Sequence, residues 1–244
     1  MNKPKLKEHY TIDDLINIME ALRGENGCPW DKVQTHDSIK KCLIEESYEA
    51  IDALDIGNDE LFANELGDVL LQVIFHSQIA KERNAFDFDK VLYEVCTKLI
   101  TRHTHVFGED AASNADEALK NWDKNKKKES GDASSSQILD EVPHHLPALL
   151  RAEKVQKKAV SFGAETHDAK NQAENISKLL SELQESLDDK SMAESVYKEI
   201  LFKITNLGRT MDICPETALS EETNRFIQKF RANENEKNLK KVEI

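Results

Sequence analysis

The chain has 244 residues, with only 8 glycines and 5 prolines, and 32% of its residues are charged. Few chain breakers and many charged helix formers predict an all-α fold and disfavour a sheet protein. The net charge of −13 excludes a general nucleic-acid binder, because phosphate backbones select basic surfaces.

The sequence also predicts a protein without a membrane span. Its start is polar and lysine-rich, and no apolar run approaches the roughly 20 residues that cross a bilayer. The 4 cysteines are scattered, with neither the paired spacing of a zinc site nor a secretory signal that would favour disulfides. We therefore expect a cytoplasmic protein.

The first helix is expected to begin after Thr11, whose side chain can cap it, and to end at Gly24. Residues 24–35 are expected to form a loop, because the glycine and proline there favour turns. Turn chemistry does not explain Trp30, which either belongs to the core or lines a pocket, and the core interpretation is favoured.

The next two helices carry acids on faces that are otherwise apolar. The first is expected over about residues 37–55 and the second from Asp59 onward, with a turn at Gly57 between them. The acids are Glu45, Glu46 and Glu49 on the first helix and Glu65 and Asp68 on the second, whose apolar stripe also includes Gln72.

Helix residues three apart share a face, so four of these carboxylates can converge where the two helices pack side by side. Unpaired carboxylates that face a core are strongly unfavourable, so they need a cation or several basic partners. Mg²⁺ prefers oxygen ligands and is typically completed by substrate phosphates. The acids therefore predict phosphate chemistry.

Two other interpretations compete with this one. A single glutamate on a helix is by default a solvated surface residue, but these acids lie among apolar side chains. A di-iron carboxylate bundle also gathers acids from neighbouring helices, but it uses Glu-x-x-His pairs. Asp68 stands where that histidine would be, which favours Mg²⁺ or Mn²⁺ over iron.

Further helices are expected over residues 87–103, with Lys98 and Arg102 four apart, and over residues 116–128, with Trp122. Residues 129–137 are small and polar and are expected to form a flexible linker. Beyond the linker, helices are expected at about residues 146–163, 170–187, 192–210 and 216–232.

The second half resembles a weakened copy of the first, which indicates a duplication. Ser181-Glu182-x-x-Glu185 parallels the first acid motif, and Val196-x-x-Glu199 parallels the second. Serine and valine thus replace two of the acids. A Mg²⁺ cluster without half of its ligands should be weak, so we expect the second half to be structural.

Several longer stretches surround these motifs along almost the whole chain. They are GCPWDKVQT (27–35), LIEESYEAIDAL (43–54), NELGDVLLQVIFHSQIA (64–80), FDFDKV (86–91), RHTHVFG (102–108) and LPALLRAEKVQKKA (146–159). With the acid motifs inside them, these stretches resemble the MazG family of nucleoside triphosphate pyrophosphohydrolases.

The resemblance implies an all-α fold of tandem MazG-like helical bundles that forms a homodimer. It implies an N-terminal domain with the complete acid motif over residues 1–128, a linker over 129–145 and a degenerate C-terminal domain over 146–244. It also implies a Mg²⁺-dependent reaction, with Mn²⁺ as an alternative cation, that cleaves a nucleoside triphosphate between its α- and β-phosphates into a monophosphate and pyrophosphate.

Carried over residue by residue, the resemblance implies that Glu46, Glu49, Glu65 and Asp68 are metal ligands. Glu45 then becomes the candidate to orient or deprotonate the attacking water.

Substrate contacts are expected from residues of two later helices. Lys98 and Arg102 can together meet the outer phosphates, although they could equally be surface cations near a helix C-terminus. Trp122 is expected to stack on the base, because the family places an aromatic residue near this point, while its alternative role is a core residue.

Two functional alternatives remain open. The eroded second half suggests a non-catalytic nucleotide-binding or interaction protein. The same fold would also serve a pyrophosphohydrolase for a deoxynucleotide or a phosphoribosyl-nucleotide, because base and sugar selectivity depend on pocket shape.

Overall fold

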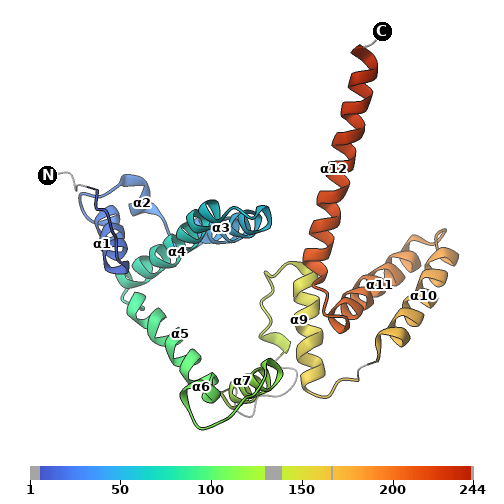
Figure 1. Ribbon diagram of the computed structural model, residues 1–244, viewed down its shortest axis with the longest axis horizontal. Helices are drawn as coiled ribbons and strands as arrows, with labels where there is room; N and C mark the ends of the chain where they lie inside the picture. Colours follow the sequence, from blue (N-terminus) through green and yellow to red (C-terminus); the bar gives the residue numbers. More distant parts are fainter. Residues whose placement is uncertain (1–5, 130–138, 166, 243–244) are drawn as a thin grey trace. The chain divides into compact units, whose positions relative to one another are not determined.

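The protein folds into helices connected by turns, as a computed structural model shows (Figure 1). The structure describes residues 6–129, 139–165 and 167–242, except for the side chains of residue 127 and of residues 235–242. These parts contain helices and no strand, so the all-α prediction is confirmed. Among the described helices, none combines the length and the apolar character needed to cross a membrane.

The chain forms two compact units, Met1–Glu129 and Ser130–Ile244. Residues 130–138, most of the linker expected at 129–137, lie outside the described residues, and Glu129 ends a helix. The helices of the first unit are α1 (Ile12–Arg23), α2 (Pro29–Val33), α3 (His36–Ile56), α4 (Asp59–Glu82), α5 (Phe88–Arg102), α6 (Thr104–Phe107) and α7 (Ala115–Glu129).

Short helices occupy two places where the sequence predicted only connections. In α2 the proline occupies the first turn, where its missing N–H costs no hydrogen bond. Trp30 on this helix is 60% exposed, so the core interpretation of Trp30 is wrong. The short α6 likewise follows directly on α5.

Helix α4 is the centre of the first unit, because α1, α3 and α5 all pack against it. The core residues come from these helices and are Met19, Ile39, Ile74, Phe75, Ile79 and Phe88. Thr11 caps α1 as predicted, since its side chain accepts from the Asp14 backbone and Asp14 bonds back to Thr11.

A tight turn folds α3 back against α4. Gly57 ends α3 with φ +73°, a left-handed conformation that glycine adopts without steric cost. Asn58 then caps α4 by accepting a hydrogen bond from the Leu61 backbone at 3.1 Å. The two helices therefore run antiparallel as a hairpin, and α3 packs on no other described helix.

A histidine pair ties the hairpin together away from the turn. The Nδ1 atoms of His36 and His76 lie 2.9 Å apart and share a hydrogen bond between the first turn of α3 and the second half of α4. Burial, and then the neighbouring His36, lower the pKa of His76. The neutral form of His76 is thus favoured in the folded protein.

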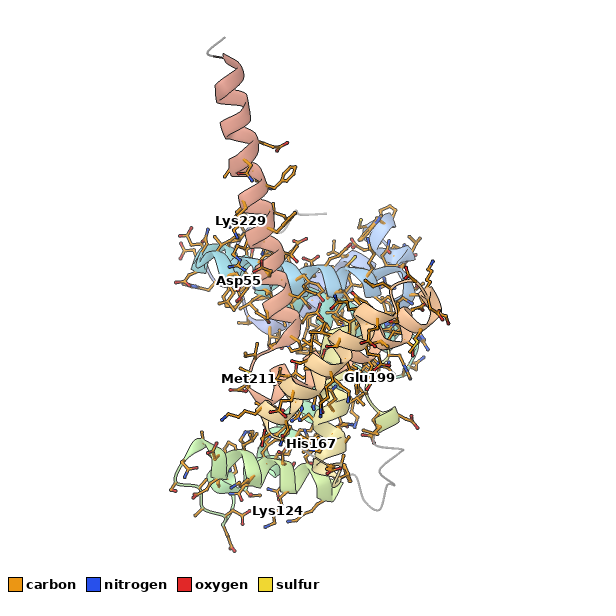
Figure 2. The ribbon with its side chains drawn as sticks, turned by 90° about the vertical axis from the view of Figure 1, so that its right-hand side faces the viewer. Asp55, Lys124, His167, Glu199, Met211 and Lys229 are labelled. Carbon is orange, nitrogen blue, oxygen red and sulfur yellow. The ribbon has the colours of Figure 1, made fainter. Side chains whose placement is uncertain are left out.

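The second unit also contains a helical hairpin. Its helices are α9 (Ala148–Ser161), α10 (Ala169–Glu185), α11 (Lys190–Thr210) and α12 (Pro215–Val242). Helix α11 packs against α10, α9 and α12, and the side chains of Ile176, Val196 and Ile200 are buried. Figure 2 shows Glu199 along α11, Met211 at its end and Lys229 on α12.

Arg23 connects three segments of the first unit from a nearly buried position. Its guanidinium donates two hydrogen bonds to Glu82 at 2.7 and 2.8 Å, and it lies over the Phe75 ring at 5.3 Å. It also donates to the backbone carbonyls of Asp31 and Gln34 at the end of α2. The Arg23 hydrogen bond is the main cause that lowers the pKa of Glu82.

We expect Arg23→Met to lower the free energy of unfolding by about 3 kcal/mol, because hydrogen bonds to a charged group are lost and two carbonyls lose a donor. The stability that the ionised Glu82 contributes through Arg23 is fully present above pH 4.5, the ordinary pKa of glutamate. It is lost as the pH falls through the lowered pKa of Glu82. Urea unfolding at neutral and acid pH measures both effects.

The matched control is Arg83→Met, which removes an exposed arginine one residue after α4 and should change stability by no more than about 0.5 kcal/mol. Equal stabilities of the Arg23 and Arg83 variants at neutral pH would show that Arg23 does not hold these segments together.

Candidate metal centre

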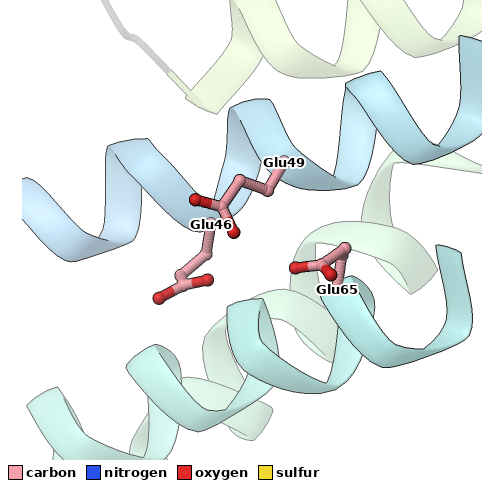
Figure 3. Close-up of side chains that lie close together, drawn as sticks. All are labelled: Glu46, Glu49 and Glu65. Carbon is pink, nitrogen blue, oxygen red and sulfur yellow. The ribbon is translucent and has the colours of Figure 1, made fainter. Parts of the chain in front are cut away.

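Three carboxylates converge where α3 and α4 face each other (Figure 3). Glu46 and Glu49 extend from α3, and Glu65 extends toward them from α4. One oxygen from each lies within 4.8 Å of the others, and the burial increases from exposed Glu49 through half-buried Glu46 to Glu65, which is only 9% exposed. The helix spacing of these residues produces the convergence, because positions three apart lie on one face.

Asp68 borders this group without belonging to it. Its charge is nevertheless the second-largest cause that raises the pKa of Glu46, so Asp68 acts electrostatically on the group. The Asn64 amide lies 3.4 Å from Glu65 and 3.5 Å from Asp68, which makes it a weak neutral donor to both. The structure therefore brings three of the four predicted ligands together and leaves the fourth adjacent.

The acids repel one another in the free protein. Burial raises the pKa of Glu46 most, and the charges of Asp68, Glu49, Glu65 and Glu45 raise it further, in that order. None of the four predicted ligands takes part in an ion pair among the described residues. A bound cation would remove this repulsion directly.

The donor set fits a hard divalent cation. Oxygens bound to one Mg²⁺ at about 2.1 Å are at most about 4.2 Å apart, so small side-chain movements would bring the three carboxylates into range. The set contains carboxylate oxygens only, which suits Mg²⁺ or Mn²⁺ better than zinc or copper. Glu46, Glu49 and Glu65 would hold the ion, with Asp68 as a further ligand.

Glu45 lies outside the group. Its carboxylate forms an ion pair with Lys41 at 2.6 Å, one turn earlier on α3, and both side chains are largely exposed. Its charge is the smallest of the causes that raise the pKa of Glu46. In this conformation Glu45 is held by Lys41 beside the acids.

The predicted substrate contacts lie on other helices. Lys98 and Arg102 belong to α5 and Trp122 to α7, and these helices pack against each other and not against α3. Arg102 donates to Glu129 at 2.6 Å and lies over the Trp122 ring at 5.2 Å, while Lys98 is exposed. The structure thus joins Arg102 to Trp122 and does not bring either to the acids.

The sequence interpretation missed Lys126, whose Nζ lies 5.0 Å from the centre of the Trp122 ring. Together with Arg102, it makes Trp122 a half-buried aromatic with two cations against it. The four-residue spacing between Trp122 and Lys126 on the helix expected there was the available signal.

The second unit holds no comparable group among its described residues. Glu182, Glu185 and Glu199 are exposed, and Glu199 pairs with Lys203 at 3.4 Å. Val196, at the position that parallels Glu65, is 6% exposed and packs in the core of that unit. An apolar contact stands here where the first unit has a buried acid.

A known protein family matches part of the first unit. The profile of the MazG nucleotide pyrophosphohydrolase domain matches residues 34–107, which span α3, α4 and α5. A Thermotoga maritima protein named nucleoside triphosphate pyrophosphohydrolase/pyrophosphatase MazG is 42% identical over 223 residues, which cover 91% of this chain and 85% of that protein. The chain belongs to the MazG family.

Two more relatives are similar over most of this chain. The nucleoside triphosphate pyrophosphohydrolase of Escherichia coli K12 is 36% identical over 90% of this chain and 86% of its own. The uncharacterized protein YabN of Bacillus subtilis is 36% identical over 93% of this chain and 48% of its own length. Both similarities extend across the two units.

The raised pKa of Glu46 predicts how stability changes with pH without metal. A folded-state pKa above the ordinary 4.5 means that the native protein binds more protons there, so this group costs stability as the pH rises through the raised value. Glu46→Gln should therefore be more stable than the wild type at neutral pH in EDTA and lose this advantage below pH 4.5. Urea unfolding over a pH series measures the difference.

Glu185→Gln, an exposed acid of the second unit, is the control and should leave the pH dependence unchanged. A Glu46→Gln variant that is less stable than the wild type at neutral pH in EDTA would contradict the repulsion between these acids.

Proposed function

We propose that the protein is a Mg²⁺-dependent nucleoside triphosphate pyrophosphohydrolase. The substrate would be cleaved between its α- and β-phosphates into a nucleoside monophosphate and pyrophosphate. The observation that carries the proposal is the convergence of Glu46, Glu49 and Glu65 beside Asp68, with the pKa of Glu46 raised by burial and by the other acids. Such a site favours a cation that is bound together with phosphates.

The names of the relatives support the same reaction class. The Thermotoga maritima and Escherichia coli proteins are named as nucleoside triphosphate pyrophosphohydrolases, and this chain covers 85% and 86% of their lengths. The protein is thus a hydrolase that acts on phosphoric anhydrides.

The residues of the site divide the work of the reaction. Glu46, Glu49, Glu65 and Asp68 would hold the cation, which when bound offsets charge on phosphate oxygens and acidifies a coordinated water. Glu45 would orient that water or accept its proton, provided that its carboxylate leaves Lys41 and comes within hydrogen-bond reach. Breaking the Lys41–Glu45 ion pair would cost little free energy, because both side chains are exposed and exposed ion pairs contribute little stability.

Substrate binding would require Arg102 to change partners. Its guanidinium now bonds to Glu129 in the geometry that it would use for a phosphate. Lys98, four residues earlier, would join it on the outer phosphates, and Trp122 would offer its ring to the base. These contacts need α5 and α7 of one chain to meet the acids of the α3–α4 hairpin, in the same or another copy.

A homodimer would allow α5 and α7 of one copy to reach the acids of the other. Ile44, Tyr48 and Ile51 follow one another at helical spacing on α3, and each is about half exposed. Leu66 and Leu70, four residues apart on α4, are also exposed. Exposed apolar stripes of this kind mark interaction surfaces, and a second copy would bury them. Light scattering of the purified protein would show twice the mass of one chain.

We assign catalysis to the N-terminal domain, residues 1–128, and a structural role to the degenerate domain over 146–244, which retains exposed acids but no acid cluster among its described residues. The linker between them covers residues 129–145. The nucleotide substrate and four free cysteines support a cytoplasmic location, and the net charge of −13 argues against nucleic acid as a partner.

Pyrophosphate release from purified protein tests the function. We expect release from a nucleoside triphosphate with Mg²⁺ and none with EDTA. Glu49→Gln should reduce kcat/KM by more than about 100-fold, because even residues that only support metal ligands contribute 10- to 100-fold.

Glu185→Gln provides the matched control, because Glu185 is the corresponding acid in the second unit and is exposed there. It should leave the rate unchanged. Nucleotide binding without turnover would favour a non-catalytic binding protein, and equal loss in both variants would contradict the assignment of catalysis to the first unit. A panel of ribo-, deoxyribo- and phosphoribosyl-nucleotides would identify the preferred substrate.

A further inference from the structure

A buried amide on α4 has an acceptor without a donor. Gln72 is 8% exposed, and its Oε1 is inaccessible to solvent and has no hydrogen-bond partner. An unpaired buried carbonyl costs about 1–3 kcal/mol, and native structures rarely retain one without a reason. The amide is therefore expected to meet a donor that the protein itself does not supply.

The position of Gln72 relates it to the acids. It follows Glu65 by seven residues and Asp68 by four, so all three lie on the same face of α4. Helices α3 and α4 pack against each other, and on this face Glu65 meets Glu46 and Glu49 of α3. Because the hairpin is antiparallel, Gln72 lies one turn beyond Asp68, on the side of the buried Ile39.

The acids of the hairpin are excluded as the donor. Ionised carboxylates only accept hydrogen bonds, so Glu46, Glu65 and Asp68 cannot satisfy the amide oxygen. A hydrated divalent cation is different, because Mg²⁺ keeps several of its waters and these waters point their hydrogens outward. Such a water is a donor of the kind that the Oε1 of Gln72 lacks.

We propose that Gln72 is a positioning residue of the metal centre. Its Oε1 accepts a hydrogen bond from a water molecule of the cation that Glu46, Glu49 and Glu65 hold. The amide would thereby position one water of the bound ion, and its burial would keep competing solvent away. This inference rests on the cation in the proposed function and adds a residue to its site.

The test is Gln72→Met, which keeps the length of the side chain and removes the amide. Mn²⁺ binding to the full chain without nucleotide, measured by electron paramagnetic resonance or calorimetry, should weaken by about 10- to 100-fold. The thermal midpoint of the metal-free variant should equal or exceed that of the wild type, because an unpaired buried amide has been removed. A merely structural glutamine would instead lower the midpoint and leave Mn²⁺ affinity unchanged.

Gln156→Met is the matched control in the second unit. Gln156 is 7% exposed and its Oε1 is also unpaired, but its Nε2 donates to the Phe202 carbonyl at 2.8 Å and no acid cluster of described residues surrounds it. Its substitution should leave Mn²⁺ affinity at the wild-type value.

Glu49→Gln separates the two proposals. Loss of Mn²⁺ binding in Glu49→Gln with wild-type affinity in Gln72→Met would overturn the role of Gln72 and leave the metal centre intact. Wild-type Mn²⁺ affinity in both variants would overturn the metal centre itself and the inference with it. Reduced affinity in both variants, with Gln156→Met unchanged, supports the role of Gln72.

Discussion

The functional part of this protein depends on the electrostatic repulsion among Glu46, Glu49 and Glu65, which lie close together between α3 and α4. Carboxylates are costly to bury and they repel each other, so three of them within 4.8 Å do not stabilise a helical hairpin. Their convergence has to be maintained by the rest of the first unit. The converging carboxylates then favour the binding of a cation together with the phosphates that accompany it.

The surrounding structure supplies this support away from the acids. Ile39, Ile74, Phe75 and Ile79 form the core at the end of the hairpin remote from its turn, and the His36–His76 hydrogen bond joins the two helices there. Gly57 and Asn58 set the turn at the opposite end. The acids thus lie between two anchored regions, where side chains can adjust to an ion while the helices stay in place.

Both units contain a helical hairpin, but among the described residues only the hairpin of the first unit carries a cluster of acids. At the position that parallels Glu65, the second unit has the buried Val196, an apolar side chain in place of a buried acid. The acids that it retains lie at the surface, and Glu199 pairs with a neighbouring lysine. Without a cluster of repelling acids, the second unit suits the structural role that we propose for it.

The helices and the acid faces were predictable from sequence, because apolar periodicity, caps and three-residue spacing are local properties. The structure differs where long-range contacts decide. The His36–His76 pair joins residues 40 apart, and the Arg102–Glu129 bond joins residues on separate helices, so neither has a local signal. Trp30 is exposed although its type favours a core, because the short α2 presents it outward. The spacing of Lys98 and Arg102 was visible, but the distance of their helix from α3 was not.

The most direct test of the central claim is a crystal structure of the protein with Mn²⁺, with the ion located by its anomalous scattering. We expect an anomalous peak in the first unit bounded by the carboxylates of Glu46, Glu49 and Glu65, with Asp68 turned toward it. A peak at the exposed acids of the second unit, with none between α3 and α4, would contradict it.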